Sequence, residues 1–178
     1  KLVNDLLNVN RIDQQRLEMR PKNFDIKNLI GAIIRELESI ASAHNIVLNL
    51  KTDKDLPQVF ADPDRIGMVI QNLIDNAIKY SKKEGGTVEI TAGIDKKNKT
   101  MIQIYVKDDG IGIPGIFQDQ IFGKFFRGDN LIKQRVEGTG LGLFIAKGIV
   151  NMSGGQIEFK SEESKGSSFW FTLPIVNN

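Results

Sequence analysis

The chain has 178 residues, of which 40% are hydrophobic and 26% charged, and its net charge is +2. This composition suits one globular domain with a sizeable core, and so small a net charge favours neither a nucleic-acid nor a membrane surface. Because there is no cysteine and only one histidine, His44, disulfides, thiolate metal sites and multi-histidine metal sites are excluded.

Two helices are predicted near the N-terminus. Apolar residues three to five apart predict a helix over 1–19, which ends before Arg20 and Pro21 because proline disfavours the α conformation in the residue before it. The narrow apolar stripe of this helix needs a partner, and because the sequence opens inside it we expect a piece of a longer protein. Asp25 is the predicted N-cap of a second, strongly amphipathic helix over 26–40.

The rest of the chain mixes strands and helices. Alternating patterns predict strands over 46–50, 58–61, 87–94, 101–107, 156–160 and 168–173, and the third and fourth form an antiparallel hairpin. Helices are predicted over 63–81, capped by Asp62, and over 139–152. This order predicts an α+β fold: a two-layer α/β sandwich with a mixed, mostly antiparallel sheet, helices on one face, and an added N-terminal helix.

The stretch QNLIDNAIKYS, residues 71–81, carries polar groups on a helix that should be buried. Asn72, Asn76, Lys79 and Tyr80 fall at helical spacing and share one face, while apolar residues cover the rest. Carboxamides facing a dry core would cost a few kcal/mol each if unpaired, so this face is predicted to line a polar cavity. Taken singly, Lys79 is more often a solvated lysine and Tyr80 an aromatic at a rim.

The segment DDGIGIPG, residues 108–115, follows a strand. Its glycine spacing matches a dinucleotide fingerprint only weakly, because Pro114 interrupts it and no parallel strand follows. Asp108 ends an apolar strand and is followed by Gly110 and Gly112, which would let a planar ligand approach, and a carboxylate there would select the exocyclic amine of adenine. For this segment alone, an ordinary Asp-Gly turn is the default.

The segment EGTGLGLFIAKGI, residues 137–149, runs from glycines into a helix. Backbone N–H groups at such a helix start bind phosphates, although a flexible hinge is the alternative. The candidate phosphate-binding residues are Gly138, Thr139, Gly140, Leu141 and Gly142. No P-loop motif occurs. The amide face, the Asp-Gly turn and this loop together predict an ATP site, in which Asn76 could ligate Mg²⁺, Lys79 reach a phosphate and Tyr80 pack along the base or sugar.

Four ordered motifs resemble the catalytic, ATP-binding domain of two-component sensor histidine kinases. NLIDNAIKYS resembles the N box, DDGIGIP the first glycine box, FGKFFR the F box and GTGLGL the second glycine box, over about residues 21–174. LVNDLLNVNRIDQQRLEMRP resembles the end of the second dimerisation helix. The resemblance implies two parts: residues 1–20, the end of that helix and a linker, and residues 21–178, the catalytic domain with an ATP lid at about 115–137.

The resemblance also implies roles for single residues. Asn76 would hold Mg²⁺ and Asn72 support the phosphates or the metal, while Lys79 and Tyr80 contact the nucleotide. Asp108 would bind the adenine amine in a pocket shaped by Gly110 and Gly112.

On the lid, Phe122 and Phe125 would anchor the segment, and Arg127 would reach the γ-phosphate during transfer. The glycines of residues 138–142 would close over the phosphates, and the lid is expected to be the most mobile segment. Lys124 and Arg135 are basic lid residues without an assigned contact. Catalytic roles are thus expected for Arg127 and Lys79.

Two departures from the family pattern matter. Asp109 stands where asparagine is common, and no histidine lies on the first helix, so the chain should bind ATP without phosphorylating itself. The implied partners are the phosphoacceptor hairpin of its own parent chain and a response regulator, with no nucleic acid and no direct membrane contact. The parent is expected to be a cytoplasmic homodimer, while its membrane anchoring and the oligomeric state of this piece are left open.

Two other functions compete with the kinase. ATP hydrolases of the same fold resemble one another in a glutamate that activates water, and the matching position here is Asn72, which cannot act as a general base at neutral pH. A non-catalytic nucleotide-binding module remains the third reading.

Overall fold

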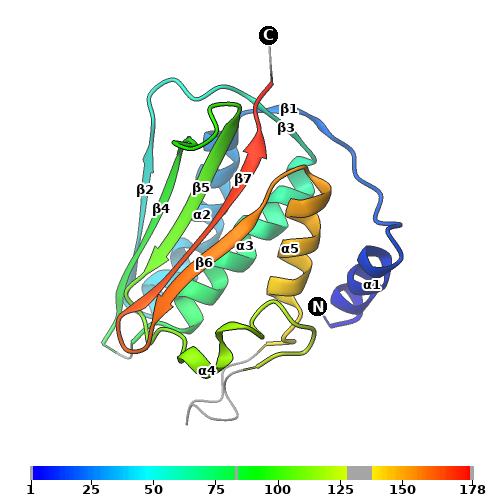
Figure 1. The fold of residues 1–178 in the computed structure, drawn as a ribbon. Coiled ribbons are helices and arrows are strands. Elements are labelled where there is room, and N and C mark those ends of the chain that lie inside the picture. Colours follow the sequence, from blue (N-terminus) through cyan, green and yellow to red (C-terminus); the bar gives the residue numbers. More distant parts are fainter. Residues whose placement is uncertain (1, 83, 128–137, 177–178) are drawn as a thin grey trace.

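The computed structural model describes residues 2–82, 84–127 and 138–176 (Figure 1). Its helices are α1 (Leu2–Asp13), α2 (Ile26–Ala43), α3 (Pro63–Lys79), α4 (Gly115–Gln118) and α5 (Gly142–Met152). Its strands are β1 (Lys22–Phe24), β2 (Ile46–Thr52), β3 (Val59–Ala61), β4 (Gly86–Ile94), β5 (Met101–Asp108), β6 (Ile157–Glu162) and β7 (Gly166–Pro174). Residues 128–137 of the expected lid, Arg135 among them, lie outside the described residues.

One sheet forms a layer and the long helices form the other. Its strand order is β2-β4-β5-β7-β6, with β2 parallel to β4 and all other neighbours antiparallel. Figure 1 shows α2, α3 and α5 on one face of this sheet and α1 beside α5. The predicted α+β class, with a mixed and mostly antiparallel sheet, is confirmed.

Helix α3 is fixed at its start by a cap and along its length by burial. Asp62 accepts hydrogen bonds from the backbone N–H groups of Asp64 (3.0 Å) and Arg65 (3.1 Å), and Pro63 takes the first turn as predicted. The apolar face is buried, and Ile66, Ile70 and Ile74 have no exposed surface. Each such side chain contributes about 2 kcal/mol of hydrophobic stabilisation, so the helix is held with its polar face turned away from the core.

The predicted helix over 1–19 is wrong in its end point, because α1 stops at Asp13. Gln15 adopts the left-handed conformation (φ 54°), the N–H of Arg16 donates to the carbonyl of Arg11, and the N–H of Gln15 donates to that of Ile12. This Schellman motif closes the helix well before Pro21. The chain then turns so that Leu17, only 4% exposed, enters the core instead of continuing the stripe.

The linker after α1 is tied to the domain at two places. The short strand β1, absent from the predicted elements, pairs with β3 in a separate two-stranded sheet. The backbone N–H of Arg20 donates to Oδ2 of Asp62 at 2.8 Å, so the residue that caps α3 also holds the linker. Among the residues described, no helix is both long and apolar enough to cross a membrane.

Candidate functional site

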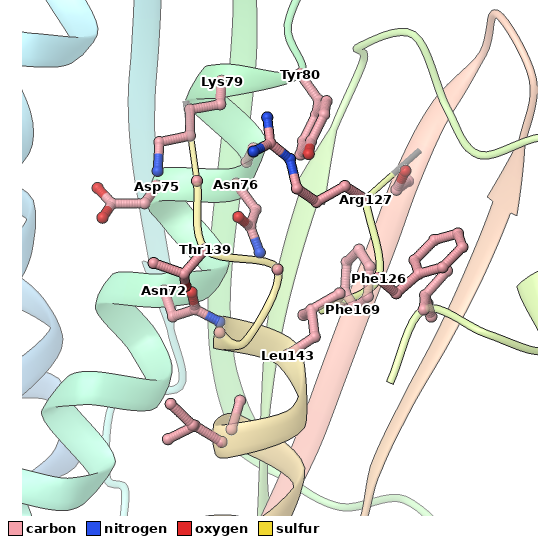
Figure 2. A pocket seen from close by; sticks show the side chains of 18 of the residues that line it. Asn72, Asp75, Asn76, Lys79, Tyr80, Phe126, Arg127, Thr139, Leu143 and Phe169 are labelled. Atoms are coloured by element: carbon pink, nitrogen blue, oxygen red, sulfur yellow. The ribbon is translucent and has the colours of Figure 1, made fainter. Parts of the chain in front are cut away.

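A cavity of about 860 Å³ opens between α3, α5, the turn after β5 and both flanks of the lid (Figure 2). Eleven of the predicted site residues line it: Asn72, Asn76, Lys79, Tyr80, Asp108, Gly112, Arg127, Gly138, Thr139, Gly140 and Gly142. Four do not: Gly110, Phe122, Phe125 and Leu141. The sequence motifs, far apart along the chain, therefore meet around one space.

The α3 wall carries the predicted amide face. Figure 2 shows Asn72, Asn76 and Lys79 projecting from successive turns of α3, with Tyr80 at its end as the C-cap residue. Within the part of the chain that the structure describes, Nδ2 of Asn72 is buried without a hydrogen-bond partner. A buried N–H donor left unpaired costs about 1–3 kcal/mol, so this group favours a ligand that supplies an acceptor.

Helix α5 approaches this amide closely. Gly142, its first residue, lies where an added Cβ would collide with Oδ1 of Asn72. The glycine therefore lets the start of α5 and the amide face of α3 share one wall of the cavity. Leu141, just before it, is fully buried and anchors the loop from below.

Asp108 adds a buried carboxyl to the lining of the cavity. Its Oδ1 accepts hydrogen bonds from the backbone N–H groups of Gly110 (2.9 Å) and Ser167 (3.1 Å), and the residue is 8% exposed. Burial raises the pKa of Asp108 to about 6, against the lowering effect of those two hydrogen bonds. At neutral pH the carboxyl is mainly ionised and can accept a hydrogen bond from an N–H group of a ligand.

The Asp-Gly turn is fastened to the end of α3 and to the β6–β7 hairpin. The N–H of Ile111 donates to the carbonyl of Tyr80 at 3.0 Å, and the N–H of Ser164 donates to the carbonyl of Ile111 at 2.7 Å. Gly110 packs against the same Tyr80 carbonyl, where a side chain would clash. Gly110 thus supports the position of Asp108 without lining the cavity itself.

The glycine loop closes the cavity above α5. Gly140 has φ 69° and lies against the backbone of Phe125 and Phe126, where a Cβ would come within 2.8 Å of the Phe126 carbonyl oxygen. A side chain there would be strained by conformation and by contact, which explains the glycine. The hydroxyl of Thr139 donates to Oδ2 of Asp5 at 3.0 Å.

The F-box segment divides its aromatic residues between support and lining. Phe122 packs edge-on to Phe159, and Phe125 is 58% exposed with a left-handed backbone (φ 58°). This local reversal turns Phe126 into the cavity, where Figure 2 shows it near Phe169. Arg127 also lines the cavity.

Sequence reasoning missed several lining residues. Asp75 belongs to α3 and could have been found by extending the polar face by one residue, whereas Ser167 and Phe169 come from β7 through the sheet register. Leu2 and Asp5 come from α1, and no local pattern marks a helix that reaches the site only through tertiary packing.

The possible metal ligands in the cavity suit a cation that binds together with a phosphate group. Among described residues there is no group of three histidine, cysteine, aspartate or glutamate side chains that could hold a metal ion alone. Asn72 and Asn76 offer carboxamide groups beside the glycine loop, and amide oxygens suit Mg²⁺, which usually keeps several waters and binds phosphate oxygens as well.

Comparisons with known proteins agree with this geometry. The family model described as histidine kinase-, DNA gyrase B- and HSP90-like ATPase matches residues 61–177. Sensor histidine kinase WalK of Bacillus subtilis (strain 168) is 37% identical over 98% of this chain, which spans 28% of WalK.

Two solved structures resemble the whole fold. Full-length ShkA in complex with AMPPNP superposes with a TM-score of 0.86 and 27% identity, covering 99% of this chain and 36% of that one. The catalytic domain of histidine kinase ThkA gives a TM-score of 0.75 and 30% identity, covering 88% of this chain and 97% of that one.

Proposed function

Since this chain belongs to the family of histidine kinase-, DNA gyrase B- and HSP90-like ATPases, and its relatives are sensor histidine kinases, we propose that it binds Mg-ATP and donates the γ-phosphate to a histidine on a separate helical hairpin. The observation that carries this proposal is one cavity lined by the amide face of α3, the buried Asp108 and the glycine loop.

Asp108 holds the adenine end. Its Oδ1 is occupied by the N–H groups of Gly110 and Ser167, so Oδ2 is the oxygen left to accept a hydrogen bond from the exocyclic amine. A charge-assisted hydrogen bond of this kind is worth about 1.5–3 kcal/mol. Tyr80, at the end of α3, packs along the base or the sugar.

Asn72, Lys79 and the backbone N–H groups of the glycine loop bind the phosphates. The unpaired Nδ2 of Asn72 donates to a phosphate oxygen, and Lys79 places a positive charge beside the chain. Asn76 supplies the metal ligand. Mg²⁺, when bound with the triphosphate, neutralises part of its charge and helps to orient it. Arg127 neutralises charge on the γ-phosphate as transfer proceeds.

The absence of a carboxylate at position 72 separates transfer from hydrolysis. Asn72 occupies the position of the water-activating glutamate in the hydrolases of this fold, and an amide cannot remove a proton from water at neutral pH. A neutral imidazole needs no such base. Its unprotonated ring nitrogen attacks the γ-phosphorus, the bond to the β–γ bridging oxygen breaks, and ADP leaves with that electron pair. The ring is positively charged after the attack and releases the proton on its other nitrogen to solvent.

In the parent protein, residues 1–20 form the end of the second dimerisation helix and a linker, and residues 21–178 form the catalytic domain. The acceptor hairpin belongs to the same parent chain. Two copies of that chain form a cytoplasmic homodimer, which passes its phosphate on to a response regulator. Neither nucleic acid nor direct membrane contact by this part is needed for that role.

A phosphate-transfer assay tests the proposal. The chain is mixed with γ-labelled Mg-ATP and a separate hairpin that carries the acceptor histidine, and acid-labile label is followed on the hairpin. Labelled hairpin supports the kinase, whereas free phosphate without it identifies a hydrolase. Binding without either product identifies a regulatory module. A hairpin with its histidine replaced by glutamine is the control and should remain unlabelled.

A further inference from the structure

Helix α1 contributes a carboxylate to the cavity. Asp5 lines the space together with Leu2, and its Oδ2 accepts the 3.0 Å hydrogen bond from the hydroxyl of Thr139. Thr139 lies between the glycines at 138 and 140, so the carboxylate of Asp5 lies beside the loop whose N–H groups are assigned above to the phosphates.

Several contacts hold α1 in this position. Val9 is buried, and Ile12 packs against Gly148 of α5, where a Cβ would come within 2.7 Å of an Ile12 methyl group. At the end of the helix, Oδ2 of Asp13 pairs with Nζ of Lys124 at 2.5 Å, and the same Nζ lies 5.0 Å from the ring centre of Phe144. Asp5 is therefore held at the cavity by the docking of the whole helix.

The charges around the cavity show what this position does. Among the described residues that line it, the acidic side chains are Asp5, Asp75 and Asp108, and the basic ones are Lys79 and Arg127. Without Asp5 the two signs would balance. Among these described residues the docked helix thus supplies the surplus negative charge, and it does so beside the loop assigned to the phosphates of a triphosphate.

We propose that Asp5 is a specificity-determining residue of the nucleotide site, whose charge weakens binding in proportion to the number of phosphates while α1 is docked. This inference rests on the proposed function. Like charges repel across the half-buried space between Thr139 and solvent, and the repulsion grows with ligand charge. Coupling is reciprocal, so a bound triphosphate also disfavours the docked position of α1.

The test compares ligands of rising charge. Affinities for adenosine, Mg-ADP and Mg-AMPPNP are measured by calorimetry on the wild-type chain and on Asp5→Asn, which keeps an oxygen able to accept from Thr139 but removes the charge. Glu18→Gln is the matched control, because Glu18 is an exposed linker carboxylate that does not line the cavity. Adenosine binding also reports that each variant retains a folded pocket.

Asp5→Asn should bind Mg-AMPPNP roughly three- to tenfold more tightly, Mg-ADP with a smaller gain, and adenosine unchanged, with the gain shrinking at high salt. Glu18→Gln should match the wild type throughout. The inference is overturned if Asp5→Asn binds all three ligands as the wild type does, if adenosine gains as much as AMPPNP, or if AMPPNP binding weakens. A wild-type chain that binds none of the three ligands would instead refute the proposed function itself.

Discussion

Replacing Asp108 by asparagine should stabilise the protein while it weakens adenine binding. Burial raises the pKa of Asp108 from 3.8 to about 6, so the folded state keeps a proton that the unfolded chain has already lost. Between about pH 4 and pH 6 the folded state binds more protons, and the free energy of unfolding therefore falls as the pH rises. Above pH 6 the folded state bears the full cost of burying the ionised Asp108, and a shift of about two pKa units corresponds to about 3 kcal/mol of unfolding free energy.

The asparagine keeps the native contacts and loses the titration. Its Oδ1 can still accept from the N–H groups of Gly110 and Ser167, which both bind Oδ1 of the wild-type side chain. The stability difference between Asp108→Asn and the wild type should thus be near zero below pH 4 and reach up to about 3 kcal/mol above pH 6.

Urea unfolding from pH 4 to pH 8, followed by the fluorescence of the single tryptophan, Trp170, measures this difference. Glu36→Gln is the matched control, because Glu36 is an exposed carboxylate on α2 that does not contribute to the raised pKa of Asp108, and its replacement should leave the pH dependence of the wild type intact. A variant Asp108→Asn that is less stable than the wild type at pH 8, or a difference that does not change with pH, would refute the reasoning.

Three further outcomes concern ligand binding. Asn76→Ala should abolish the Mg²⁺ dependence of ATP binding in calorimetry, and a persisting dependence would move the metal elsewhere. Adenosine affinity should fall about tenfold per pH unit below pH 6, because protonation of Asp108 competes with the adenine amine, and Asp108→Asn should bind about 1–3 kcal/mol more weakly without that slope. Gly142→Ala should lower nucleotide affinity and also lower the free energy of unfolding by about 1–3 kcal/mol, because the added methyl group meets Asn72. Gly115→Ala is the control and should change neither quantity, because the space around Gly115 is open.

Local patterns were enough for most of the fold and for the core of the site. The period of α3 alone placed Asn72 and Asn76 on one polar face, and the cap at Asp62 fixed where that face begins. Alternation gave the β4–β5 hairpin and hence the position of Asp108 at a strand end. These features depend on neighbours within one or two turns, which is the range that a sequence pattern encodes.

The errors arose where distant packing decides the conformation. Leu17 fits a helical stripe, yet its burial in the core favours the turn at Gln15 over a helix that continues to residue 19. Phe125 and Phe126 are indistinguishable by type, and the left-handed backbone at the first sends only the second into the cavity. Asp5 reaches the site through the docking of α1 on α5, and no pattern in the residues around Asp5 predicts that docking.

The shared carboxylate of Asp62 has a mechanical consequence. One oxygen caps α3, while the other accepts a hydrogen bond from the N–H of Arg20. The chain is therefore attached at Arg20 to the N-terminus of α3, the helix that carries the amide face. Residues 2–19 can swing about this hinge point at the cost of their own contacts alone. A movement that also displaces Arg20 must break its hydrogen bond to the buried carboxylate of Asp62, which is worth about 1.5–3 kcal/mol. Such a movement would therefore disturb the N-terminus of α3.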